Sequence, residues 1–270
     1  MSLNSPSHDL PIEEGPPRLI SGADRLEIQL SRPAVHNRLE PDDMFRLRDL
    51  LEAAAQRPEV RLVVFRAGGP SFCSGINLKA LGAGRTRPKH VSEALALFER
   101  LPDLIEALPA PTLFVLNGPL YGGAIDAVLA GCFRIAVPAT TFSVAAPSRG
   151  ALYSPAGVAR AVSVLGASAA RRLFILGQTI TAEELRPLGG VDQISEAGQL
   201  SADAARFSDA ICAKGPLPVR AAKRIIQDAA RGIFNAEAAK AMREEVSRSE
   251  DLAEGMAAWR ERRPPRFKGR

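Results

Sequence analysis

The sequence predicts an α/β protein that ends in a wholly helical part. Short runs of β-branched and aliphatic residues alternate with amphipathic stretches up to about residue 200, and every later stretch has a helical pattern. Strands that alternate with helices are typical of an α/β core. We therefore expect a core over residues 18–200 and a helical region over residues 201–270. Residues 1–17 are polar and proline-rich, as in a disordered leader.

The first elements are three strands and a helix. Residues 18–20 and 25–30 predict a strand pair joined by a tight turn, and residues 61–66 predict a further strand. Between them, Pro41 opens a predicted helix. Its apolar side chains fall on one face, which is typical of a helix packed on a core: Met44, Leu47, Leu50 and Leu51.

The middle of the chain combines a loop with further strands and helices. Residues 82–88 carry glycines, arginines and a proline, which favours a mobile loop. We expect a helix over residues 91–108, a strand over 112–116 and a helix over 122–131. The last of these helices is apolar nearly all round, which predicts that it is buried.

Shorter elements follow, and then the helical part. They are predicted in this order: strand 134–136, strand 141–143, helix 157–165 and helix 167–176. Gly166 separates the last two, and Thr181 with Glu184 forms an N-capping pattern for a further helix. Four helices are predicted after it: 202–213, 218–231, 236–248 and 251–262.

Composition places the chain among ordinary globular proteins. Of its 270 residues, 46% are hydrophobic and 24% are charged. The apolar runs are shorter than the ~20 residues that span a bilayer, and the N-terminus lacks the pattern of a signal peptide. The three cysteines and three histidines are scattered, which argues against a disulfide framework or a zinc site. We expect a cytoplasmic protein without membrane association.

The net charge of +5 lies in the C-terminal tail. Residues 260–270 carry six basic residues and one acidic residue, so the rest of the chain is neutral. A nucleic-acid-binding protein would spread its charge over a folded face, so we expect no nucleic-acid partner. The tail fits either a solvated end or a contact to a compact polyanion such as a phosphorylated cofactor.

Two glycine-bearing turns carry most of the functional information. Residues 71–79 and 117–126 each follow a strand pattern and end where a helix begins. Two such turns can direct backbone N–H groups at one point, where developing negative charge would be stabilised. Each glycine alone fits an ordinary turn, but the repeated arrangement favours a paired anion site.

Further segments extend this pattern: RPAVHNRL at 32–39, FCSG at 72–75, LGQTITAEE at 176–184 and RRPPRFKG at 262–269. With the two turns they resemble the crotonase (enoyl-CoA hydratase/isomerase) family over roughly residues 18–270. The resemblance implies the ClpP/crotonase fold, a right-handed spiral of ββα units with a C-terminal helical trimerisation region. It also implies an acyl-CoA thioester substrate, a homotrimer or a hexamer (dimer of trimers), and no cofactor or metal, since CoA is part of the substrate.

The resemblance assigns catalytic roles to three positions. The N–H groups of Ile76 and Gly123 would form an oxyanion hole for the thioester, and Asp126 would stand where the family's hydratases carry the first of two glutamates. An acid in the first turn of a helix also complements the helix dipole without any catalysis. Its apolar neighbours favour a buried, unpaired carboxylate of raised pKa, which suits acid–base chemistry.

The second glutamate of the family is missing. Its position is Ala146, and where some family isomerases carry an aspartate this chain has Ser154, beside Tyr153. This departure argues against efficient hydration and leaves acyl-CoA binding and enolate stabilisation intact. Three activities stay open: a 2-enoyl-CoA hydratase/isomerase reaction, another single-carboxylate reaction (isomerisation, decarboxylation or C–C bond formation), and acyl-CoA binding with little catalysis.

The resemblance also implies the walls of the acyl-CoA site. They would come from both turns, from the loop after residue 143 and from the tail: Ser74, Gly75, Asn77, Leu78, Lys79, Gly122, Ala146, Tyr153, Ser154, Phe267 and Lys268. Lys79 fits a solvated charge and a phosphate contact equally well. Phe267 and Lys268 are expected to serve a neighbouring subunit's ligand. Cys73 and Cys132 are interpreted as small core residues rather than nucleophiles.

Overall fold

The computed structural model describes residues 14–77, 79–80, 88–196 and 198–270. A six-stranded sheet forms the core, and its neighbouring strands are parallel except for the first pair. The strands lie in the sheet in this order: β1 (Gly15–Ser21), β2 (Arg25–Ser31), β3 (Leu62–Ala67), β4 (Thr112–Leu116), β6 (Phe133–Ala136) and β9 (Gln193–Ile194).

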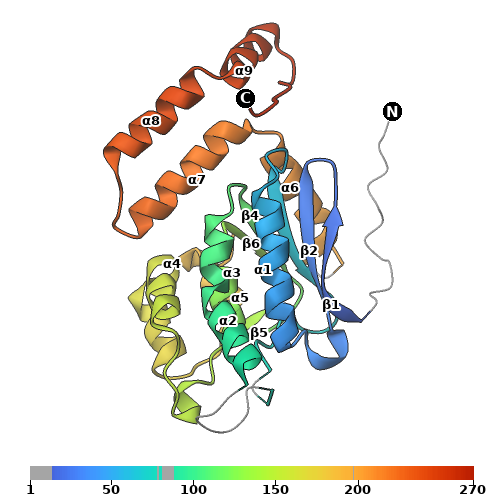
Figure 1. The fold of residues 1–270 in the computed structure, drawn as a ribbon, viewed down its shortest axis with the longest axis vertical. Helices are drawn as coiled ribbons and strands as arrows, with labels where there is room; N and C mark the ends of the chain where they lie inside the picture. Colours follow the sequence, from blue (N-terminus) through green and yellow to red (C-terminus); the bar gives the residue numbers. More distant parts are fainter. Residues whose placement is uncertain (1–13, 78, 81–87, 197) are drawn as a thin grey trace.

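Both faces of this sheet are covered by helices. Successive side chains of a strand point to opposite faces, so β3, β4 and β6 each contribute to two hydrophobic clusters. Leu62 and Val64 of β3 pack with α6 (Leu200–Cys212) on one face. Phe65 belongs to the larger cluster on the other face, where its ring stacks on Phe114 at 4.4 Å between centroids. Three helices cover that face (Figure 1): α1 (Pro41–Ala55), α2 (Lys89–Ala107) and α3 (Ala124–Leu129).

A second, smaller layer explains how the chain coils. It contains β5 (Leu120–Tyr121), β7 (Thr141–Ser143) and β8 (Ile180–Thr181). Isolated bridges join Leu39 to Ile76 and Cys73 to Leu120 in the same way. Each repeat therefore leaves a strand of the large sheet, passes through this layer and enters a helix. This succession confirms the predicted spiral of ββα units.

The remaining helices follow the predicted order. α4 (Pro155–Phe174) is interrupted at Gly166, whose φ is +79°, and α5 (Ala182–Leu185) has the predicted Thr181–Glu184 capping box. α7 (Pro216–Ala230), α8 (Ala236–Ser247) and α9 (Glu250–Glu261) extend away from the sheet (Figure 1). The part of the chain that the structure describes also contains three short 3-10 segments: Pro33–Val35, Pro147–Arg149 and Arg186–Leu188.

Several boundaries differ from the sequence prediction. β1 begins at Gly15, within the predicted leader, and residues 1–13 lie outside the described part. The predicted loop at 82–88 also lies outside it, apart from Pro88. α3 has six residues rather than the ten predicted, so a helix dipole contributes less at Gly123 than a full helix would. Among the described residues, no helix is long and apolar enough to cross a membrane.

Candidate active site

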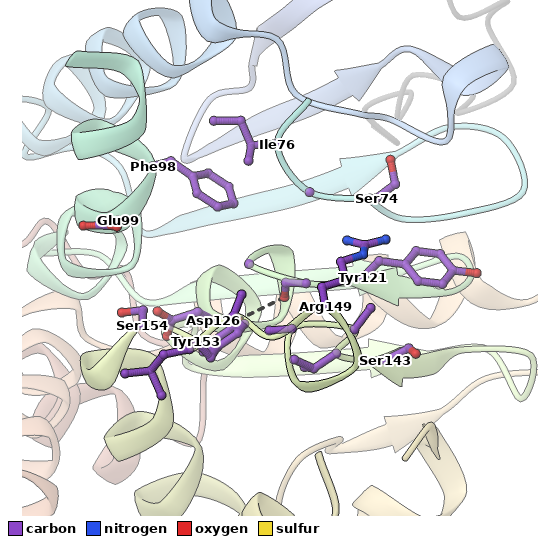
Figure 2. Close-up of a pocket in the computed structure, with 18 of the residues that line it drawn as sticks. Ser74, Ile76, Phe98, Glu99, Tyr121, Asp126, Ser143, Arg149, Tyr153 and Ser154 are labelled. Atoms are coloured by element: carbon purple, nitrogen blue, oxygen red, sulfur yellow. Dashed lines mark hydrogen bonds between the residues drawn. The ribbon is translucent and has the colours of Figure 1, made fainter. Parts of the chain in front are cut away.

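A cavity of about 590 Å³ lies where the second layer meets α2 and α3. Nine of the predicted site residues line it: Ser74, Gly75, Ile76, Gly122, Gly123, Asp126, Ala146, Tyr153 and Ser154. Figure 2 shows Ser74, Ile76 and Phe98 across the cavity from Asp126, Tyr153 and Ser154. The fold thus brings together predicted site residues that are up to 80 positions apart, from Ser74 to Ser154.

The two glycine turns lie side by side in this cavity. The amide of Tyr121 donates to the carbonyl of Cys73 at 3.0 Å, which aligns the second turn with the first. Gly75 has φ +82°, and a Cβ there would lie 3.8 Å from the nitrogen of Gly123 and 3.1 Å from the carbonyl oxygen of Tyr121. Among the described residues, neither the N–H group of Ile76 nor that of Gly123 is used by a neighbouring backbone carbonyl.

Asp126 is buried and paired. Its side chain is 6% exposed, and its carboxylate accepts a hydrogen bond from the guanidinium of Arg160. The expectation of an unpaired carboxylate was therefore wrong, because an arginine from α4 reaches it. Burial raises the pKa of Asp126 above its ordinary value, and the positive charge of Arg160 partly offsets this effect.

Arg160 is the main residue that the sequence prediction missed. Its guanidinium also pairs with Glu106 at 2.9 Å and with Asp103 at 2.8 Å, while its own side chain is only 8% exposed. A buried arginine requires acidic partners. A signal was present, since Arg160 is the single charge within the predicted helix 157–165 and Asp126 is the single charge within 122–131. One charge in each of two otherwise uncharged helices indicates an ion pair.

Tyr153 and Ser154 both have structural partners. The hydroxyl of Tyr153 donates to the carbonyl of Gly122 at 3.0 Å, the dashed line of Figure 2, and burial raises its pKa. The hydroxyl of Ser154 caps α4 by accepting from the amide of Gly157 at 3.3 Å. Tyr153 therefore stays protonated at neutral pH and holds the second turn in place.

Some predicted contacts lie away from the cavity. The side chain of Asn77 donates to Glu40 at 2.8 Å and so fastens the first turn to the start of α1. Lys79 is exposed and does not line the cavity, which favours the solvated interpretation within one chain. Leu78 lies outside the described residues.

The tail folds back on α9. Asp251 accepts hydrogen bonds from the amides of Lys268 and Gly269 at 2.6 and 2.8 Å, and the carbonyl of Phe267 accepts from Arg61. Figure 1 shows this end of the chain beside α9, far from α3. Phe267 and Lys268 do not line the cavity of their own chain, so their role toward a neighbouring subunit stays a prediction.

The cavity also contains residues that sequence reasoning did not select. α2 contributes Leu95, Phe98 and Glu99, and the loop before α4 contributes Arg149 and Leu152. Glu99 and Arg149 are exposed. Glu99 gives the cavity a second carboxylate besides Asp126, on a helix that no family motif marked.

Neither metal nor thiol chemistry is indicated by the described residues. No group of three or more histidine, cysteine, aspartate or glutamate side chains within them is arranged to hold a metal ion. Burial raises the pKa of Cys73 to about 12, so this thiol remains neutral.

Comparison with known proteins decides the family. The model of the enoyl-CoA hydratase/isomerase family matches residues 23–270. The chain belongs to this family. A human relative, enoyl-CoA hydratase domain-containing protein 2, mitochondrial, is 32% identical, and the match covers 94% of this chain and 89% of the human protein.

Solved structures of the enoyl-CoA hydratase/isomerase family share the fold. An enoyl-CoA hydratase from Bacillus anthracis superposes with a TM-score of 0.84 at 25% identity, covering 95% of this chain and all of that one. An enoyl-CoA hydratase from Polaromonas sp. JS666 superposes with a TM-score of 0.83 at 26% identity, covering 94% and 100%. The predicted family and the crotonase-like fold are therefore confirmed.

Proposed function

We propose that this chain processes acyl-CoA thioesters by holding the enolate oxygen with the amides of Ile76 and Gly123 and by moving one proton with Asp126. The observation that carries the proposal is the placement of both turns and a buried carboxylate in one cavity. Backbone donors aimed at a developing oxyanion are among the strongest catalytic devices of enzymes. A pKa raised by burial brings Asp126 nearer to the range useful for proton transfer.

The reaction that fits one buried carboxylate is isomerisation between a 3-enoyl-CoA and a 2-enoyl-CoA. Asp126 removes a proton from the α-carbon of the 3-enoyl ester, and the electron pair moves to the thioester oxygen as the enolate. The same carboxylic acid then returns the proton to the γ-carbon, which leaves a 2-enoyl-CoA. Hydration would need a second acid or base for the attacking water, and position 146 carries alanine.

The assembly and surroundings are part of the proposal. We expect the homotrimer or hexamer that the family resemblance implies, with CoA entering as part of the substrate and with no cofactor or metal. The name of the human relative places that protein in mitochondria. The cytoplasmic location of this chain therefore stays a prediction.

The test is Asp126→Asn, assayed with a 3-enoyl-CoA and with crotonyl-CoA. We expect isomerisation to fall at least ~10²-fold while affinity for the CoA ester changes by less than about three-fold. The control is Asp49→Asn, which neutralises an exposed acid paired with its neighbour Arg48. Near-normal turnover by Asp126→Asn would refute the assigned role. If the unaltered protein binds CoA esters but converts neither substrate, it is a binding protein instead.

A further inference from the structure

The Asp126–Arg160 pair separates two cavities. Asp126 lines the candidate active site, whereas Arg160 lines a second cavity of about 1020 Å³ between α4 and α7. Gly157 closes the site around the carboxylate, since a Cβ at Gly157 would lie 2.7 Å from Asp126 Oδ2. The charge of Arg160 therefore acts on the carboxylate at close range and in a largely buried setting, where ion pairs are poorly screened.

Arg160 is the second member of a longer chain of charges. Its Nε lies 2.9 Å from Glu106 and its Nη2 lies 2.8 Å from Asp103, both on α2. Glu106 also pairs with Arg231, the residue that caps α7, and the same arginine lies 4.0 Å from Asp103. The charges of these ion-paired residues alternate in sign: Asp126 is negative, Arg160 is positive, Glu106 and Asp103 are negative, and Arg231 is positive.

Besides the ion pair between Arg231 and Glu106, two hydrogen bonds hold the end of α7 to α2 and α4. Gln227 donates to the carbonyl of Glu106 at 3.2 Å, and Ser163 of α4 donates to the carbonyl of Ala230 at 3.3 Å. The position of Arg231 therefore depends on the position of α7, which belongs to the helical region that projects from the sheet (Figure 1).

We propose that this chain of charges sets the proton affinity of Asp126, so that Arg160, Glu106 and Arg231 are positioning residues that couple the seating of α7 to the active site. The inference rests on the proposed function, in which Asp126 moves the proton. The proposal predicts the direction in which each substitution shifts the pKa of the Asp126 carboxyl. Loss of Arg160 removes the positive charge beside Asp126, which raises the pKa of the carboxyl.

Loss of Glu106 has the opposite effect. Arg160 then has one acidic partner fewer, so its positive charge acts more fully on Asp126 and lowers the pKa of that carboxyl. Loss of Arg231 leaves Glu106 and Asp103 less neutralised, which weakens the effect of Arg160 and raises the pKa slightly. A residue with a merely structural role would not produce shifts of opposite sign.

Other ionisable groups also face Asp126. They come from α2, from the loop before α4 and from the segment before α1: Glu99, Asp103, Arg149, Tyr153 and His36. Tyr153 is neutral and its hydroxyl is occupied by Gly122. Glu99 and Arg149 are exposed, so solvent and salt screen them. These groups are identical in all the variants below and therefore do not generate the pattern of signs.

The experiment measures the acidic limb of the kcat/KM profile for 3-enoyl-CoA isomerisation. In Arg160→Gln we expect its midpoint to rise by about one pH unit or more. In Arg231→Gln it should rise by a smaller amount, and in Glu106→Gln it should fall. The matched control is Arg224→Gln, which removes an α7 arginine that pairs with Asp228 of its own helix.

A second measurement keeps the inference separate from the proposed activity. The pKa of the Asp126 carboxyl is read by carbon-13 NMR of aspartate-labelled protein, with Asp126→Asn identifying the signal. The same order of shifts is expected there, even if the assayed reaction is the wrong one. Unchanged midpoints in Glu106→Gln, or shifts of one sign in all three variants, would overturn the inference. If Arg160→Gln does not fold, the downward shift in Glu106→Gln decides.

Discussion

The two glycine turns and the wall that faces them, formed by α3 and the loop before α4, contribute to the cavity in different ways. The turns offer backbone amides of Ile76 and Gly123, which are aligned by the pairing of Tyr121 with Cys73. The opposite wall depends on side chains, and each of these needs a partner from another element: Asp126 has Arg160, and Tyr153 has Gly122. The turns present backbone groups whose type does not depend on the side chain, whereas the chemistry of the opposite wall depends on which side chain meets which partner.

The largest expected effect comes from changing the first turn. Gly75→Ala forces a side chain into φ +82° and places its Cβ 3.1 Å from the carbonyl oxygen of Tyr121. We expect the Ile76 amide to be displaced and kcat to fall ~10²-fold, as when one oxyanion donor is lost. Stopped-flow or steady-state assays with a CoA ester would measure this loss.

Gly198→Ala is the control for the effect of backbone strain alone. Gly198 also has φ +82°, but a Cβ there meets no atom within 4 Å. Both variants should lose about 1–2 kcal/mol of stability from the left-handed backbone. Only the variant at position 75 should lose activity. Equal activity in the two would mean that the first turn contributes no oxyanion donor.

The second prediction concerns the second glutamate of the family, which is missing from the opposite wall at Ala146. Ala146→Glu should restore a second acid for water attack and raise hydration of crotonyl-CoA about ten-fold or more, since a positioned general acid or base contributes at least this much. The matched control is Ala145→Glu, which adds the same charge at an exposed neighbouring position that also lines the cavity. Fast hydration by the unaltered protein would contradict the view that position 146 limits this reaction.

Features that depend on nearby residues could be predicted from the sequence, whereas contacts between distant residues could not. The strand patterns, the break at Gly166 and the Thr181–Glu184 box depend on nearby residues, and all three are confirmed. β5, β8 and β9 have two residues each and were not predicted, because pairing rather than local pattern makes them strands. Within the site, both turns were predicted. The partner of Asp126 was not, since 34 residues separate it from Arg160.

A smaller effect is expected from the tail, where backbone and side-chain roles can be separated in one residue. The amide of Lys268 binds Asp251, while its ammonium group lies 3.8 Å from Glu250 and is largely exposed. Lys268→Gln keeps the amide contact and removes the charge. We expect affinity for a CoA ester to fall about two- to three-fold at low salt, and less at high salt.

The control for the tail is Lys240→Gln, an exposed lysine of α8. A pantetheine thioester lacks the CoA phosphates, so its affinity should be the same for Lys268→Gln and the unaltered protein. Equal losses for the CoA and pantetheine esters would assign the tail to assembly instead.

The smallest expected effect concerns Glu99, the carboxylate that the fold brings to the cavity from α2. It is exposed to solvent, whereas the side chain of Asp126 is buried. Glu99→Gln should therefore change isomerisation and crotonyl-CoA hydration by less than about two-fold. A selective loss of hydration would mean that Glu99 supplies the acid missing at position 146. In that case the side-chain wall would be completed by a helix remote from the family motif, and a hydratase activity would replace the isomerase proposed for this chain.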